Sequence, residues 1–378
     1  MIILRIILLP FVLFSFTETS FCQELKLNPP SVDHPLSEIV QSLVGDGIEI
    51  SKFRTNQRSG SAIGSFEAPW EGFGMEKGLM MTTGSIFNAV GPNSSEKKGS
   101  NNRRSGDPVL EKLLGNNVKT YDACILELEV IPKADTMAFN FMFASEEYDK
   151  FVGSEYNDVF AFFIKGKGIE NGRNIALIPN TDQPVSINNV NHGNMDNEYP
   201  AVNPIFYIKN TDSLSMLEYN GYTKLIEVKQ AVVPNETYIL RLSIADVSDG
   251  LLDSGVFIEG NSLHAYHESY QVRFPSGKYN LDGTSISQLN NLLRKMQMTK
   301  SDKVELAGHT DSEGNYDANM ELSNNRVNAV VNYLVNQGVK KDHIKIYARG
   351  ETMPIANNDT EYGKKQNRRV EIKLLGSD

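Results

Sequence analysis

Cysteine, tryptophan and long apolar runs are scarce in this chain of 378 residues. It holds two cysteines, Cys22 and Cys124, and one tryptophan, Trp70. Two cysteines cannot form the disulfide framework on which many small secreted domains depend. After the apolar start of the chain, no apolar run reaches the roughly 18 residues typical of a membrane-spanning helix. We therefore expect no transmembrane segment in the mature chain.

Basic residues are too few for a nucleic-acid-binding surface. The chain has 37 Lys and Arg against 47 Asp and Glu, a net charge of −10. Residues 268–378 hold 16 basic and 14 acidic side chains, a net of +2, so residues 1–267 carry −12. An acidic body repels phosphate, which excludes nucleic acid as a partner. The charge difference and the length together predict two domains.

Motifs of known hydrolases are also missing. The six histidines form no His-Glu-x-x-His zinc motif, and there is no Gly-x-Ser-x-Gly elbow and no phosphate-binding loop. His264 and His267 have the spacing of two metal ligands, but no third ligand accompanies them. Glu146 and Asp158 resemble a glycosidase pair whose separation the sequence does not give. The sequence favours a non-catalytic protein with no required cofactor, and a cell-wall-modifying hydrolase stays as an alternative.

The first 16 residues hold one Arg and a run of Ile, Leu, Phe and Val interrupted by Pro10, and polar residues follow at once. This pattern is typical of a secretory signal peptide, so we expect residues 1–22 to be removed on export. Two fates are open for Cys22. Cleavage after it would place the small residues Ser20 and Cys22 at positions −3 and −1, whereas lipidation would make Cys22 an anchor. Phe21 is bulky where lipoprotein signals carry a small residue, which favours cleavage.

Residues 25–263 alternate short apolar runs with turns rich in Gly, Asn, Asp and Pro. This alternation predicts a mostly β, sandwich-like domain. The expected strands are 135–143, 159–164, 175–179, 238–244 and 255–259, and the expected helices are 36–44 and 108–114.

Oxygen-bearing side chains gather at the ends of these expected strands. They are Glu146, Asn157, Asp158, Asp246, Asp249 and Asp253. Oxygen ligands suit Ca²⁺, which makes these six residues a candidate calcium site, although none of the runs is an EF-hand loop. The alternative is that they cap turns and keep an exported protein soluble. Trp70, Tyr148 and Tyr156 give a further alternative, a glycan-stacking platform, against ordinary aromatic packing.

Several short motifs of this region stand out. They are LVGDG at 43–47, GMEKG at 74–78, FASEEY at 143–148, YNDVF at 156–160 and DSGVF at 253–257. In these motifs the region resembles the choice-of-anchor L family of Bacteroidetes envelope proteins. The resemblance implies a common module joined to varied C-terminal anchors, and it supplies no molecular activity. A glycan or an envelope protein is the expected partner of this module.

A second set of motifs lies near the C-terminus. Gly308-His309-Thr310-Asp311 follows the apolar residues of an expected strand, so Asp311 should lie just past its end on a loop open to solvent. Ser323 fits a helix N-cap, which would put Arg326 in the first turn, and Gly338 fits the C′ position. The expected strands are 270–274, 303–308, 344–348 and 369–374, and the expected helices are 285–298 and 323–337. They predict a small α/β domain with a βαβαβ-type layer.

These motifs, with Asn319, Leu322 and the run Asn367-Arg368-Arg369-Val370-Glu371, resemble the OmpA-like domain family. The resemblance implies binding of the diaminopimelate side chain of peptidoglycan, with Asp311 contacting its ammonium and Arg326, beside a helix N-terminus, contacting its carboxylate. Thr310 and Asn319 would add hydrogen bonds, and Leu322 and Ser323 match the neighbouring motif positions. The alternative is a structural Asp311–Arg326 salt bridge, with Arg368 and Arg369 covering a sheet edge and His309 in a loop.

Together these patterns predict an exported, multidomain protein. Its parts would be a signal peptide at 1–22, a choice-of-anchor L-like β-rich domain at 23–265 and an OmpA-like domain at 268–378. We expect it in the periplasm, associated with the outer membrane or cell wall and anchored non-covalently to peptidoglycan. A surface adhesin built from the same domains is the alternative function.

Overall fold

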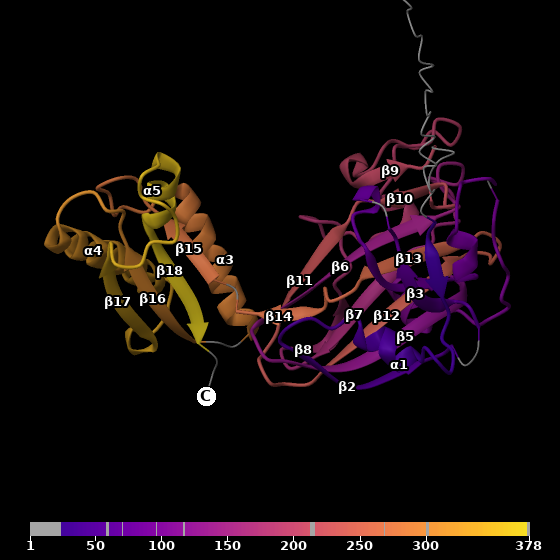
Figure 1. The fold of residues 1–378 in the computed structure, drawn as a ribbon, viewed down its shortest axis with the longest axis horizontal. Helices are drawn as coiled ribbons and strands as arrows, with labels where there is room; N and C mark the ends of the chain where they lie inside the picture. The colour runs from indigo at the N-terminus through magenta and orange to yellow at the C-terminus, as the bar shows by residue number, and fades with distance from the viewer. Residues whose placement is uncertain are drawn as a thin grey trace, which may run out of the picture.

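The computed structural model describes residues 24–57, 60–69, 71–95, 97–115, 118–211, 216–267, 269–299 and 302–375. The chain forms a large β-rich domain followed by a small α/β domain (Figure 1). The expected signal peptide, Cys22 and Trp70 lie outside the described residues. Within the described part of the chain, no helix is both long enough and apolar enough to cross a membrane.

Two antiparallel sheets build the large domain, as the alternating sequence pattern predicts. The first sheet has the order β1-β3-β4-β13-β6-β10-β9, with β11 and β14 also paired to β6. Its strands are β1 (Lys26–Asn28), β3 (Ile63–Glu67), β4 (Lys77–Thr82), β6 (Thr136–Ser145), β9 (Tyr207–Lys209), β10 (Gly221–Thr223), β11 (Ile226–Ala231), β13 (Ser254–Glu259) and β14 (His264–Tyr266). The second sheet has the order β2-β5-β12-β7-β8. Its strands are β2 (Ile48–Thr55), β5 (Thr120–Pro132), β7 (Val159–Gly166), β8 (Ile169–Asn174) and β12 (Tyr238–Val247).

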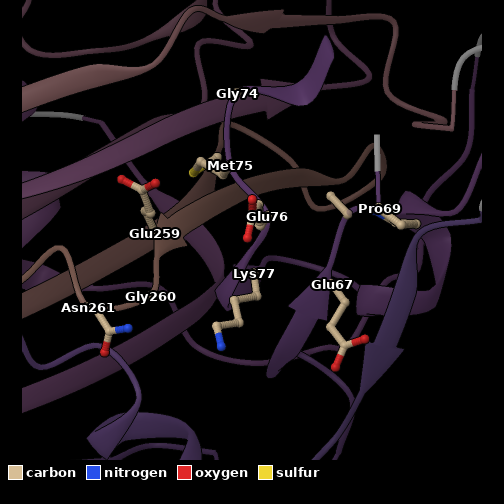
Figure 2. A pocket seen from close by; sticks show the side chains of 10 residues that line it. Glu67, Pro69, Gly74, Met75, Glu76, Lys77, Glu259, Gly260 and Asn261 are labelled. Carbon is tan, nitrogen blue, oxygen red and sulfur yellow. The ribbon is translucent and has the colours of Figure 1, made fainter. Parts of the chain in front are cut away.

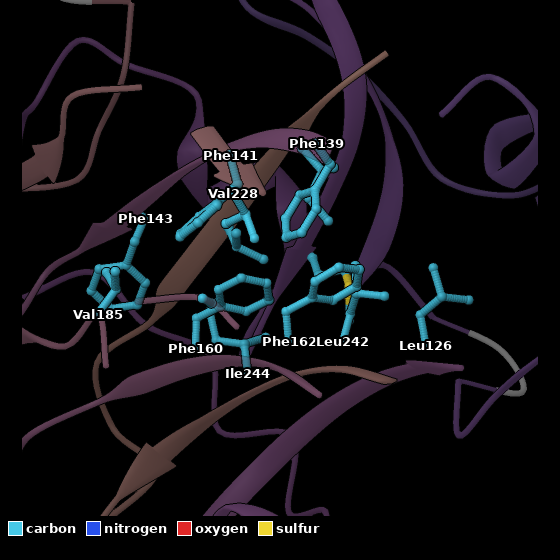
Figure 3. Close-up of a cluster of buried hydrophobic side chains, with 14 of the residues drawn as sticks. Leu126, Phe139, Phe141, Phe143, Phe160, Phe162, Val185, Val228, Leu242 and Ile244 are labelled. Carbon is cyan, nitrogen blue, oxygen red and sulfur yellow. The ribbon is translucent and has the colours of Figure 1, made fainter. Parts of the chain in front are cut away.

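The main core lies between these two sheets (Figure 3). Phe139 and Phe141 of β6 point inward at every second position and meet aromatic rings of β7. The ring centroids of Phe139 and Phe162 lie 4.0 Å apart, and those of Phe141 and Phe160 lie 5.1 Å apart. The period of two that defines a strand therefore places a continuous aromatic layer inside the sandwich.

The outer faces of both sheets are covered as well. On the first sheet, Phe66, Phe73 and Phe257 pack edge to face within a second buried cluster. On the second sheet, the helix α2 (Pro108–Leu114) places Leu110 in a smaller cluster. Because strands buried on both faces need apolar residues at successive positions, the central strands read as nearly unbroken apolar runs.

Most of the expected elements of this domain are present. Strands β6, β7, β12 and β13 and the helix α2 occur where the sequence predicts them, and α1 (Leu36–Gln41) ends three residues early. The strand expected at 175–179 is wrong. Asn174 ends the preceding strand β8, because its side-chain Oδ1 accepts hydrogen bonds from Phe162 N at 2.9 Å and Ala176 N at 3.1 Å. The following residues make one isolated bridge, between Leu177 and Pro184.

The small domain has a four-stranded sheet in the order β15-β18-β16-β17, with β16 and β17 parallel. Its strands are β15 (Ser269–Arg273), β16 (Lys303–His309), β17 (Ile344–Gly350) and β18 (Arg369–Leu375). Its helices are α3 (Gly283–Thr299), α4 (Tyr316–Asn336) and the short α5 (Glu361–Asn367), which the sequence did not predict. Leu289, Leu292 and Met296 of α3 are buried against the sheet. The fold is the expected α/β layer.

The start of α4 differs from the expectation. Its N-cap is Asn315, whose Oδ1 accepts a hydrogen bond from Ala318 N at 2.8 Å, so the helix begins seven residues before Ser323. Ser323 lies inside the helix, where a Cβ added at Gly308 of β16 would come within 2.3 Å of its carbonyl oxygen. The serine motif position therefore serves close packing of α4 on β16. The C-terminal end is as expected, with Gly338 at φ +94°.

In the described segments, five short 3₁₀ turns connect the elements: η1 (Glu71–Phe73), η2 (Ile86–Ala89), η3 (Ile187–Asn189), η4 (Pro204–Phe206) and η5 (Lys341–His343). The junction between the domains is short, and α3 faces the large domain across it (Figure 1). Lys295 Nζ of α3 lies 3.3 Å from Asp135 Oδ1, next to β6 of the large domain. Asp135 Oδ2 also lies 2.9 Å from His267 Nδ1 in the junction. The two domains are therefore joined by a buried polar contact as well as by the chain.

Candidate functional site

The candidate ligand pocket of the small domain starts where β16 ends. Thr310 and Asp311 follow directly after His309, the last residue of that strand. Asp311 is 4% exposed, so the expectation of a loop open to solvent is wrong. Its Oδ2 accepts a hydrogen bond from Arg368 Nη1 at 2.7 Å. The carboxylate is thus held, buried, in a direct ion pair.

Arg326 projects from the middle of α4 into the same region and is fully buried. Its guanidinium donates to three backbone carbonyls, those of Lys278 at 2.9 Å, His309 at 2.8 Å and Pro275 at 3.2 Å. Burial lowers the pKa of Arg326 to about 10, and the charge of Asp311 opposes that shift. Since α4 begins at Tyr316, the expected helix N-terminus beside Arg326 is absent. Arg326 instead fixes the loop after β15 against the end of β16.

Arg368 belongs to this pocket, although the sequence patterns suggested a place at a sheet edge. It lies between α5 and β18, and β18 is an inner strand between β15 and β16, so the sheet-edge interpretation is wrong. Its side chain borders a hollow of about 420 Å³ that Phe274 and Pro275 also line. Because α5 was not predicted, the sequence could not bring this arginine to Asp311. Arg369, by contrast, donates to Glu371 Oε1 at 2.8 Å and is structural.

Several polar atoms around the Asp311–Arg368 pair are buried without a hydrogen-bond partner. They include Thr310 Oγ1 and Arg368 Nε. His309 belongs to β16 and not to a loop, and both of its ring nitrogens are also buried without a hydrogen-bond partner. Burial and the nearby Arg369 lower the pKa of His309 to about 4, so the ring is neutral at pH 7. Unused donors beside a charged pair are what a polar ligand would satisfy.

The other predicted pocket residues take more peripheral roles. Asn319 is buried on α4, and its amide donates to Glu351. Leu322 is half-buried on the same helix. Ser323 Oγ accepts from Gly350 N at 3.1 Å and donates to Met320 O at 2.8 Å, so its hydroxyl is committed to the protein. A ligand would meet Asp311, Thr310 and Arg368 first.

Most of the candidate calcium residues of the large domain are buried. Glu146, Asp158, Asp246 and Asp253 are 1–3% exposed, and Glu147 joins them at 3%. Asp246 is the second-last residue of β12. Two of the predicted residues are peripheral: Asn157 is half-buried and accepts from Asn188 N at 2.8 Å, and Asp249 is half-buried on the loop after β12.

Burial raises the pKa values of these carboxyl groups. The pKa of Glu146 is about 9, with the neighbouring Glu218 adding to the effect, and that of Glu147 is about 10. The pKa of Asp158 is about 7, although Ser254 Oγ and Val247 N both donate to it. Within the described ranges, no three His, Cys, Asp or Glu side chains converge closely enough to hold a metal ion as they stand.

The aromatic platform receives no support from the residues described. Tyr148 is 2% exposed and packs against Tyr207 at 4.7 Å between ring centroids, so it offers no face to a sugar. Tyr156 packs edge to face on Phe151.

A large hollow of about 730 Å³ lies elsewhere, beside β3 and β4 (Figure 2). Its charged lining residues are Glu67, Glu76, Lys77 and Glu259. No described side chain that lines it has a buried polar atom without a hydrogen-bond partner. The hollow therefore shows no prepared ligand contact.

Comparison with known proteins divides the chain in the same way. Residues 29–264 match the Choice-of-anchor L domain family and residues 273–368 match the OmpA family. Probable lipoprotein YiaD of Escherichia coli is 32% identical over 139 residues, which are 36% of this chain and 63% of that protein. Peptidoglycan-binding protein ArfA of Mycobacterium tuberculosis is 40% identical over 84 residues, 22% of this chain and 26% of ArfA.

Among solved structures, the peptidoglycan-associated lipoprotein from Burkholderia pseudomallei matches with 23% identity and a TM-score of 0.27, over 28% of this chain and 90% of that one. The chain spans less than two thirds of the length of the curated relatives named above. The family match over residues 29–264 covers more than half of the chain. The chain belongs to the Choice-of-anchor L domain family and carries an OmpA-family domain at its C-terminal end.

Proposed function

We propose that this chain is a non-catalytic cell-envelope protein that its OmpA-family domain holds non-covalently on peptidoglycan. The observation that carries the proposal is the buried Asp311–Arg368 ion pair, 2.7 Å long, next to the buried Arg326. The far end of a diaminopimelate side chain bears an ammonium and a carboxylate on one carbon. A ligand of that kind can insert between the two charges and satisfy both.

The expected contacts follow from the charges. Asp311 takes the ammonium, and Arg368 takes the carboxylate through N–H groups that include the unpartnered Nε. Arg326 uses three N–H groups on carbonyls, which leaves two of its five donors and its positive charge for the carboxylate. Thr310 Oγ1 adds a hydrogen bond. Asp311 and Arg368 are already removed from water in the folded chain. Ligand binding therefore does not add the free-energy cost of desolvating them.

The relatives support this proposal. ArfA is named as a peptidoglycan-binding protein, and the matched Burkholderia structure is that of a peptidoglycan-associated lipoprotein. One such pocket binds modestly, but the wall presents many repeats, so rebinding would hold the protein in place. We place the protein in the periplasm at the cell wall, where the Choice-of-anchor L domain would meet a glycan or an envelope protein.

Co-sedimentation of the exported chain with purified walls tests the proposal. Walls containing diaminopimelate should pellet the wild-type protein, and walls containing lysine at that position should not, because lysine lacks the second carboxylate. Asp311→Ala should remain in the supernatant. The control is Asp342→Ala, which removes an exposed carboxylate in η5 and should pellet like wild type.

A wild-type chain that stays in the supernatant with both kinds of wall would contradict the proposal. So would an Asp311→Ala variant that pellets normally while its circular dichroism spectrum shows an intact fold. Equal pelleting with both walls would mean that the pocket does not recognise diaminopimelate.

A further inference from the structure

The hollow beside Arg368 extends past the contacts assigned to diaminopimelate. It encloses about 420 Å³, within the range of roughly 300–1,000 Å³ in which protein pockets hold small molecules. Pro275 lines it, and the carbonyl of Pro275 accepts a hydrogen bond from Arg326 Nη2 at 3.2 Å. The hollow therefore adjoins the Asp311–Arg368 pair and has room for more of a ligand than one ammonium and one carboxylate.

Positive charge dominates the lining of this hollow. Its charged residues are the three cations Arg273, Lys365 and Arg368 and one carboxylate, Asp282. Asp282 is already engaged by the protein, because its Oδ1 accepts a hydrogen bond from Ser285 N in the first turn of α3 at 2.8 Å. An anionic group therefore suits the hollow better than a second ammonium does.

Two helices supply uncommitted donors to the hollow. Thr284 and Gln288 lie one turn apart on α3, and Lys365 lies on α5. All three are exposed, and none of their side chains forms a hydrogen bond or an ion pair with another residue of the described ranges. The preceding residue, Lys364, differs, because its Nζ lies 2.6 Å from Glu313 Oε1. Lys365 is therefore the cation of α5 that remains available to a ligand.

Arg368 connects these donors to the diaminopimelate contacts. It is 9% exposed, its Nη1 donates to Asp311 at 2.7 Å, and its Nε is buried without a hydrogen-bond partner. A buried donor without an acceptor is destabilising, so a ligand oxygen is expected at Nε. If the diaminopimelate carboxylate occupies that position, the next part of the stem peptide lies beside the exposed donors of α3 and α5.

We propose that the hollow binds a second carboxylate of the peptidoglycan stem peptide, with Lys365 as its charged contact and Thr284 and Gln288 as hydrogen-bond donors. This contact rests on the proposed function, because bound diaminopimelate is what brings the stem to the hollow. Two carboxylates have the required chemistry. One is the α-carboxylate of the γ-linked glutamate that precedes diaminopimelate, and the other is the C-terminal carboxylate of the stem. A lysine ammonium accepts either of them.

Titration calorimetry of the full exported chain at low salt tests the proposal with three soluble muropeptides. All three contain diaminopimelate; one has both stem carboxylates free, one has the glutamate carboxylate amidated, and one has the C-terminal carboxylate amidated. Lys365→Gln should bind the free peptide about threefold more weakly than wild type, as expected for an exposed charge pair. One of the two amidations should weaken wild-type binding by the same factor, and that amidation identifies the carboxylate.

The same amidation should have no further effect on Lys365→Gln, because the contact is already lost. Lys341→Gln, at an exposed position of η5, is the matched control and should bind all three peptides like wild type.

Three results would overturn the proposal. In the first, Lys365→Gln binds the free peptide like Lys341→Gln, which would leave the diaminopimelate contacts intact and remove only the second carboxylate. In the second, the effects of amidation and of Lys365→Gln multiply, which would mean that Lys365 does not contact the amidated group. In the third, the wild type binds none of the peptides, which would contradict the proposed function as well.

Discussion

At the scale of single residues, Asp311 and Arg368 form the charged centre of the small domain. Both side chains are nearly buried, at 6% and 11% exposure, and they lie 2.7 Å apart. Removing one partner of a buried pair leaves the other charge without compensation, at a typical cost of about 3–5 kcal/mol. The pair therefore contributes to folding as well as to ligand binding.

Arg368→Ala should lower the free energy of unfolding of the small domain by about 3 kcal/mol and abolish wall binding. Urea unfolding followed by circular dichroism measures the first effect, and co-sedimentation the second. Arg349→Ala is the control, because Arg349 is exposed and lies over the Tyr347 ring. If Arg368→Ala and Arg349→Ala lower the free energy of unfolding equally, the buried Asp311–Arg368 pair stabilises the domain no more than an exposed arginine does.

Glu146 gives a prediction about pH. Its pKa is about 9 in the folded chain, mainly through burial, against an ordinary value of 4.5. The folded state then binds more protons than the unfolded state between these two values, so stability falls as pH rises through that window. The unfolding midpoint of the wild type should drop between pH 5 and 9. Glu146→Gln should reduce this dependence, because Glu147 and Asp158 keep their raised pKa values, and it should be the more stable protein at pH 8. A wild-type midpoint independent of pH would count against the shift.

At the scale of elements, α4 shows what sequence patterns can and cannot locate. Its apolar face, with Val327, Val330 and Leu334, is buried, and Gly338 follows its end as predicted. The predicted start of the helix is seven residues too late. Serine is a common N-cap residue, which favoured Ser323, whereas the actual cap is Asn315. The first two turns carry Ala318, Met320 and Leu322 at every second position, which is not the spacing of a helix face, so no helical periodicity marks them.

The same limit explains the remaining element errors. The helix α5 is short and polar, and its start depends on Thr360 Oγ1, which accepts from Gly363 N at 3.0 Å. Without α5, Arg368 could not be placed beside Asp311. The strands β6, β7, β12 and β13 were found because their apolar runs are long. The strand predicted at 175–179 does not form, because the Asn174 side chain accepts backbone hydrogen bonds that end β8. Local propensity does not reveal this contact.

Gly338 supplies the prediction at this scale. It follows α4 at φ +94°, and a Cβ added there would have nothing within 4 Å, so any cost of substitution is conformational. Gly338→Ala should lower the free energy of unfolding by about 1 kcal/mol. Gly283→Ala, at the start of α3 with equally open space, should be neutral or stabilising. Urea unfolding distinguishes the two, and equal effects would contradict the left-handed conformation of Gly338.

At the scale of the whole molecule, the buried contact at the junction sets how the domains meet. The sequence predicted two domains and a short junction, but it gave no sign that they touch. Lys295 and Asp135 are 8% and 9% exposed, and these two ion-pair partners lie far apart in the sequence. Long-range ion pairs of this kind depend on the finished fold, which is why local patterns did not reveal them.

Lys295→Met should uncouple the domains. The variant keeps the apolar stem of the side chain but removes the ammonium group that lies 3.3 Å from Asp135 Oδ1. Calorimetry should show thermal transitions of the two domains moving apart, and small-angle scattering should show a larger radius of gyration. Lys345→Met, at an exposed position of β17, is the control and should leave both measurements unchanged. If Lys295→Met behaves like that control, the junction contact does not fix the orientation of the domains.

The most direct test of the central claim is titration calorimetry of the exported chain with two soluble muropeptides. One carries diaminopimelate in its stem peptide, and the other carries lysine at the same position. Because the two differ in the carboxylate that Arg368 and Arg326 would receive, the first should bind saturably and the second at least tenfold more weakly. Equal affinity for both peptides, or no heat with either, would contradict the proposed peptidoglycan anchor.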